Sequence, residues 1–125
     1  MIRRAFALRL KPGSFPEYKQ RRDNIWPELV EESARSGIAS MISFENDPTI
    51  FIDSEIQAEK AWEKLWESDV HYRWSELFEH LIDIVDGKPA AGELRVIFHL
   101  ETGQNAQLLA APAGVPGSQG GWEPE

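Results

Sequence analysis

The sequence predicts a single α+β domain in which four strands form an antiparallel sheet and helices cover one of its faces. The chain has 125 residues, which is the size of one domain with one hydrophobic core. Four segments alternate apolar and polar residues with the period of two that is typical of half-buried strands. Segments with helical spacing of apolar residues separate them in the order β-α-β-β-α-β. This order defines the ferredoxin-like, split βαβ arrangement.

The first predicted strand covers residues 2–10, IRRAFALRL. Its apolar face consists of Ile2, Phe6, Leu8 and Leu10. Arg4 falls on this apolar face and is the one residue that departs from the alternation. Lys11-Pro12-Gly13 ends the strand, because proline and glycine favour a turn.

A bent pair of helices is expected from Phe15 to about Ser36. Pro27 interrupts the pattern, since proline lacks an amide donor and disfavours helix at the residue before it. We therefore expect a break at residues 23–26 and a second helix beginning at Pro27. Gly37 supplies the left-handed residue that ends it.

A hairpin follows over residues 38–45 and 50–56, joined at Asn46-Asp47-Pro48. Its predicted core face consists of Ile38, Ile42, Phe44, Ile50, Ile52 and Ile56. Two short helices are expected next, over residues 58–67 and from Ser68 or Asp69 to Leu81. The last predicted strand covers residues 93–100.

Helices on one face leave the other face of the sheet open, and a two-fold dimer can close it by packing sheet against sheet. The sequence therefore predicts a homodimeric α+β barrel. The residues expected on the enclosed face are Ala5, Ala7, Arg9, Met41, Ser43, Phe51, Asp53, Glu55, Ile97 and His99. We expect this domain to span residues 1–102, and the Gly, Ala and Pro-rich residues 103–125 to form a mobile tail.

The composition excludes several classes of function. The net charge is −8, from 21 acidic and 13 basic residues, which argues against binding to nucleic acid or to anionic membranes. There is no cysteine, and three scattered histidines do not have metal-ligand spacing. No segment resembles a signal peptide or a membrane span. We therefore expect a cytoplasmic protein that binds a small molecule.

One segment resembles a known family. The stretch from Tyr18 to Leu29, YKQRRDNIWPEL, is similar to the most recognisable stretch of the L-rhamnose mutarotase family. The opening MIRRAF, the run DVHYRW and the closing GELRVIFHL also resemble family segments, in the same order. The resemblance implies a dimeric α+β barrel that interconverts the α and β anomers of L-rhamnose or a related 6-deoxyhexose without a cofactor. Such a reaction needs a base for the anomeric hydroxyl proton and an acid for the ring oxygen.

The resemblance also implies site residues. Tyr18 and Trp74 match sugar-binding positions of the family, whereas Arg22 stands where the family has its catalytic histidine. Met41 replaces a sugar-binding tyrosine, and Ser75 replaces the second of two tryptophans. Arginine stays protonated, so it can stabilise an oxyanion but is a poor proton shuttle.

Asp53 and Glu55 are two apart on one strand and therefore share a face. We hypothesise that Asp53 or Glu55, held near Arg22, takes the role of the missing histidine. His99 is predicted on the same face, which favours it as a substrate-binding residue over His71 and His80.

Two alternative functions remain open from the sequence. A small-molecule tailoring enzyme or cyclase could use the same barrel, because Met41 and Ile97 suit a less polar ligand. A catalytically silent sugar-binding relative would explain the loss of the family's histidine and strand tyrosine.

Overall fold

The computed structural model describes residues 1–103. The tail predicted for residues 103–125 therefore lies, apart from Gly103, outside the described residues. The chain divides into a compact unit, Met1–Arg95, and a second unit that begins at Val96. Within the described part, no helix has the length and apolar character needed to cross a membrane.

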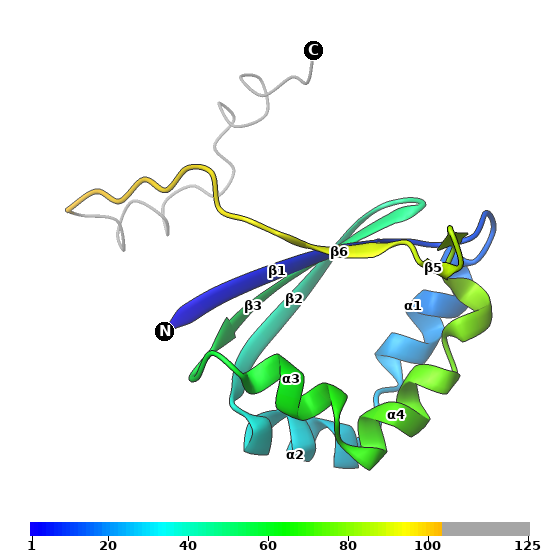
Figure 1. The fold of residues 1–125 in the computed structure, drawn as a ribbon, viewed down its shortest axis with the longest axis horizontal. Helices are drawn as coiled ribbons and strands as arrows, with labels where there is room; N and C mark the ends of the chain where they lie inside the picture. The colour runs from blue at the N-terminus through cyan, green and yellow to red at the C-terminus, as the bar shows by residue number, and fades with distance from the viewer. Residues whose placement is uncertain (104–125) are drawn as a thin grey trace. The chain divides into compact units, whose positions relative to one another are not determined.

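The compact unit is a four-stranded antiparallel sheet with helices on one face, as predicted (Figure 1). The strands are β1 (Ile2–Arg9), β2 (Ile38–Asn46), β3 (Thr49–Ile56) and β6 (Ala91–Leu94), in the spatial order β2-β3-β1-β6. The helices are α1 (Phe15–Asp23), α2 (Pro27–Ser36), α3 (Ala61–Trp66) and α4 (Asp69–Glu76), followed by a 3-10 turn, η1 (Glu79–Leu81). A small hairpin of β4 (Ile84–Val85) and β5 (Lys88–Pro89) precedes β6.

The break between α1 and α2 lies where the sequence predicts it. Trp26, the residue before Pro27, is extended with ψ of 135°, and Pro27 begins α2. Gly37 ends α2 with φ of 110°, a conformation that favours glycine. These local signals turn the chain twice and bring both helices under the same sheet.

The predicted orientation of β2 is wrong. A bulge between Ile38 and Ser40 shifts the register by one residue. Because side chains alternate along a strand, such a shift reverses the face of every residue that follows. Ile42 and Phe44 consequently lie on the face away from the helices and are each 56% exposed.

The last strand is also shorter and earlier than predicted. It covers Ala91–Leu94 instead of residues 93–100, and the described residues 95–103 form no strand. In this register Leu94 pairs with Ala5, so the next pair would set Arg95 opposite Arg4. The pairing ends before that position.

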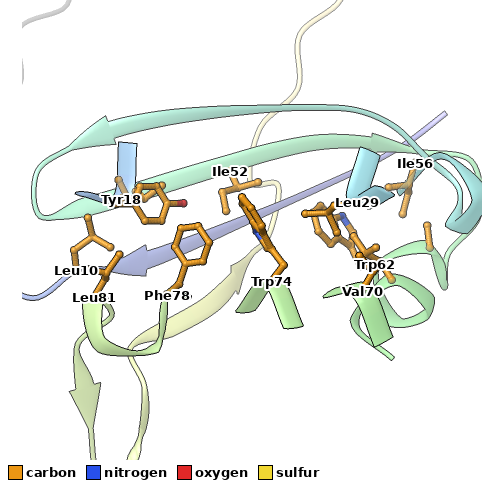
Figure 2. Close-up of a cluster of buried hydrophobic side chains, with 13 residues drawn as sticks. Leu10, Tyr18, Leu29, Ile52, Ile56, Trp62, Val70, Trp74, Phe78 and Leu81 are labelled. Carbon is orange, nitrogen blue, oxygen red and sulfur yellow. The ribbon is translucent and has the colours of Figure 1, made fainter. Parts of the chain in front are cut away.

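The core lies between the sheet and the helices (Figure 2). It consists of Leu10, Tyr18, Leu29, Ile50, Ile52, Ile56, Ala61, Trp62, Leu65, Val70, Trp74, Phe78 and Leu81. One polar residue, Ser54, is buried in the sheet beneath α3 and is 2% exposed. Its hydroxyl donates a hydrogen bond to the carbonyl oxygen of Arg4 at 2.7 Å and accepts one from Trp62 Nε1 at 2.9 Å. Ser54 therefore links the two central strands to α3.

Candidate functional site

A cavity of about 860 Å³ lies between the helix face of the sheet and the helices. Its walls come from β1, β2, β3 and β6 on one side and from α1 to α4 on the other. Apolar and aromatic side chains make up most of the lining, with a few polar groups among them. This combination is typical of a binding site for a small organic ligand.

Helix α1 contributes Tyr18 and Arg22 to the cavity wall. They are four residues apart, so they occupy the same face of the helix. The ring of Tyr18 is 5% exposed and packs edge-on against Phe78, with 5.4 Å between ring centroids. The guanidinium carbon of Arg22 lies 5.6 Å from the centre of the Tyr18 ring, a cation–π contact. The packing of Tyr18 thus also positions Arg22.

Helix α4 contributes His71, Trp74 and Ser75, which share a face at spacings of three and four residues. The helix begins after Ser68, whose hydroxyl accepts a hydrogen bond from the backbone N–H of His71 at 3.2 Å. Trp74 is 3% exposed and packs edge-on against Trp26, at 5.1 Å between centroids. Trp74 is therefore both a core residue and part of the cavity wall. Figure 2 shows its ring beside that of Phe78 in the core.

Met41 lines the same cavity, on the helix side of the sheet. The sequence placed it on the opposite face, and the bulge in β2 accounts for the difference. Five of the residues predicted for the site therefore line one cavity: Tyr18, Arg22, Met41, Trp74 and Ser75.

Asp53 and Glu55 lie on the other face of the sheet. Both form ion pairs with Arg3, at 2.6 Å to Asp53 and 3.6 Å to Glu55. Because β3 presents Ser54 to the core, its neighbours Asp53 and Glu55 must point away from the helices. The expected proximity of this pair to Arg22 is therefore wrong.

His99 belongs to the second unit, where its Nε2 lies 3.1 Å from a carboxylate oxygen of Glu101. Its role in binding substrate stays a prediction. Among the described residues, no group of three or more His, Asp or Glu side chains is arranged to hold a metal ion.

The sequence missed a charged cluster in the cavity wall, formed by Arg4, Glu63 and Glu93. Arg4 donates two hydrogen bonds of 2.8 Å to the carboxylate of Glu93 and bonds of 3.1 and 3.3 Å to that of Glu63. Arg4 lowers the pKa of Glu93, and the backbone of Glu63 together with Arg4 lowers the pKa of Glu63. The departure of Arg4 from the alternation of the first strand was the available signal.

His71 is the second residue that the sequence undervalued. Partial burial lowers the pKa of its imidazole, and the positive charge of Arg22 lowers it further. The imidazole is therefore neutral at neutral pH. Arg22 and His71 line the same cavity from different helices, and no short-range pattern in the sequence indicates this.

The chain is similar to known proteins over most of its length. A sequence model of a family described as L-rhamnose mutarotase matches residues 3–100. The chain is 33% identical over 106 residues to an L-rhamnose mutarotase from Tolumonas auensis, across 80% of this chain and 99% of that protein.

Two solved structures share the fold. A crystal structure of an L-rhamnose mutarotase from Formosa agariphila aligns with a TM-score of 0.67 at 22% identity. The alignment covers 81% of this chain and 100% of that protein. A dimeric ferredoxin-like protein from an uncultured marine organism aligns with a TM-score of 0.54 at 13% identity, covering 80% of this chain and 97% of its own. At these identities, the similarity concerns the fold alone.

Proposed function

This chain belongs to the L-rhamnose mutarotase family, and we propose that it is an isomerase that interconverts the α and β anomers of L-rhamnose or of a related 6-deoxyhexose. The observation that carries the proposal is that Tyr18, Arg22 and Trp74 line one cavity, although they come from two separate helices. These are the positions at which the resemblance implies sugar binding and catalysis.

The lining of the cavity suits a 6-deoxyhexose. Such a sugar has an apolar face and a methyl group in place of one hydroxymethyl group, so it needs both apolar contacts and a few hydrogen bonds. Trp66 and Met41 offer partly exposed apolar surface, at 43% and 37% exposure. Tyr18 and Ser75 offer hydroxyl groups, and the charged cluster around Arg4 offers carboxylate oxygens.

Arg22 occupies the family's catalytic position and has a different chemical role from histidine. Its guanidinium presents five N–H donors and remains charged. In the proposed reaction it stabilises the negative charge that develops on the sugar oxygen when the ring opens. It does not carry the proton itself.

We also propose that the protein acts as a homodimer in which the two sheets face each other. The face of the sheet away from the helices carries Ala5, Ala7, Ile42, Phe44, Phe51 and Leu94. Exposed apolar surface of this kind favours association with a second copy. The fold shared with a dimeric ferredoxin-like protein supports the same arrangement. The cytoplasmic location stays a prediction from the sequence.

Exchange NMR on L-rhamnose tests the proposed activity. At anomeric equilibrium, saturation of one anomeric proton should reduce the signal of the other when the protein is added, because each turnover converts one anomer to the other. L-fucose and D-glucose, run under the same conditions, measure selectivity for the sugar. Saturation transfer from protein to sugar without anomer exchange would instead support the catalytically silent relative. Absence of both binding and exchange would refute the proposal and favour a ligand other than these sugars.

A further inference from the structure

The proposed reaction requires a group in the cavity that accepts and returns a proton near neutral pH. The ionisable side chains of the lining, among the described residues, are Arg4, Tyr18, Arg22, Glu63, His71 and Glu93. Histidine is the residue type whose charge ordinarily changes between pH 5 and pH 8. His71 is the one histidine in that list, which makes it the first candidate for proton transfer.

The other charged groups of the lining are less suited to this role. Arg4 is hydrogen-bonded to both Glu63 and Glu93, and it helps to keep the pKa of each carboxyl low. Carboxylates stabilised in this way are weak bases. Arginine is a weak acid as well, so Arg22 supplies charge and hydrogen bonds rather than a proton.

Arg22 of α1 and His71 of α4 line the same cavity. Tyr18, at the start of α1, contacts Phe78, which follows the end of α4. Arg22 is one turn beyond Tyr18 on α1, and His71 is near the start of α4. The effect of Arg22 on the pKa of His71 agrees with their shared place in the cavity lining. No residue among 1–103 forms a hydrogen bond with the imidazole ring, so neither ring nitrogen is engaged by a described protein group.

We propose that His71 is the catalytic base and acid of this site, with Arg22 as its electrostatic partner. This proposal rests on the mutarotase activity proposed above. It assigns the proton transfer to α4, whereas the resemblance implies a histidine on α1, at the position of Arg22.

The proposed step moves one proton between the two oxygens of the anomeric carbon. Neutral His71 takes the proton of the anomeric hydroxyl, its O–H electrons form the carbonyl bond, and the bond from C1 to the ring oxygen breaks. The electron pair of that bond stays on the ring oxygen, whose negative charge Arg22 stabilises until the imidazolium of His71 protonates it. After the aldehyde rotates, the reverse sequence closes the ring on the other face of C1. The net proton balance is zero.

Among the charged groups near α4, Arg22 is the one whose charge shifts the pKa of His71. On α4 itself, Arg73 is paired with Asp69 at 3.2 Å and with Glu28 of α2 at 3.8 Å. On α3, Glu63 is paired with Arg4. Burial and the charge of Arg22 together favour neutral His71, so activity should fall on the acid side, below the ordinary histidine pKa of about 6.5.

The variant His71→Gln tests the proposal, and His80→Gln is its matched control. His80 is exposed and paired with Glu17, away from the cavity lining. General acid–base catalysis contributes about 10²–10⁴-fold, so His71→Gln should lower the rate of L-rhamnose anomer exchange by that factor. Saturation transfer from protein to sugar should persist, because the binding residues remain. His80→Gln should exchange at the wild-type rate.

The pH profile supplies a readout that a structural role would not change. Below the pKa of His71, the activity of the wild type should fall tenfold per pH unit. This acid limb of the pH profile should be absent in His71→Gln. Arg22→Gln should move the limb to higher pH, because it removes the positive neighbour, and this measurement does not depend on the folding of His71→Gln. An unchanged rate in His71→Gln, or an acid limb that persists in it, would overturn the role of His71 alone. Absence of exchange in wild type would overturn the proposed function and this role with it.

Discussion

Replacement of Ser54 by alanine is a direct test of how the sheet holds α3 over the cavity. The hydroxyl of Ser54 bridges the backbone of Arg4 and the indole N–H of Trp62. Ser54 and Trp62 are 2% and 6% exposed, so water cannot readily replace the lost oxygen. The substitution Ser54→Ala leaves the indole N–H buried without an acceptor.

The expected cost follows from this burial. A buried donor that loses its partner costs about 1–3 kcal/mol, and the carbonyl of Arg4 loses a second hydrogen bond of smaller consequence. We expect Ser54→Ala to lower the free energy of unfolding by about 2 kcal/mol, equivalent to roughly 8–16 °C in Tm for a domain of this size. Ser43→Ala, at an exposed position of β2, is the control and should change stability by less than about 0.5 kcal/mol.

The assay is urea unfolding followed by tryptophan fluorescence, at one fixed protein concentration because a dimer is stabilised by mass action. A double-mutant cycle with Trp62→Phe isolates the hydrogen bond. Phenylalanine has no N–H to leave unpaired, so the double variant should be more stable than the sum of the single effects by about 1 kcal/mol. Additive effects, or a Ser54→Ala variant as stable as Ser43→Ala, would refute the reasoning.

Three further predictions concern the dimer, the charged cluster and the proton-transfer group. Phe44→Glu places a charge on the exposed apolar face of the sheet and should convert the dimer to a monomer in sedimentation experiments; an unchanged mass would contradict the proposed interface. Arg4 lowers the pKa of Glu93, so wild type should gain stability from this carboxylate above about pH 4.3 and lose it as the pH falls through the lowered pKa. Urea midpoints should therefore fall less steeply with acid in Arg4→Gln, and equal slopes would count against the pairing. Arg22→His, introduced into His71→Gln, returns an imidazole to the same cavity and should restore exchange by at least tenfold in the NMR assay; no recovery would show that proton transfer there needs the α4 position.

Local chemistry made several elements of the fold predictable. The break at Pro27 and the stop at Gly37 depend on the backbone limits of proline and glycine, which act within one or two residues. The alternation of β3 is equally local, since every second residue of that strand is buried. These signals sufficed for the element order and for the ferredoxin-like class.

The orientation of the side chains of β2 and the length of β6 depend on how these strands pair with their neighbours in the sheet. A single bulge before Ser40 reversed the predicted face of β2, and no residue there carries a distinct signal for it. β6 ends at Leu94, which pairs with Ala5 of β1, and the alternating pattern of residues 93–100 does not mark that end. Register is a property of two strands, and one strand's pattern cannot specify it.

Some relations between the site residues follow from the sequence, and others follow from the tertiary structure. The sequence by itself determined that Tyr18 and Arg22 share a helix face, and that Trp74 and Ser75 follow one another on a second helix, because these relations come from residue spacing. Only the tertiary structure decided that the two helices line one cavity, that His71 and Arg22 both belong to that lining, and that Asp53 and Glu55 face away from it. Those relations join residues that are far apart in the chain, and they follow from how the apolar faces of the helices pack beneath the sheet.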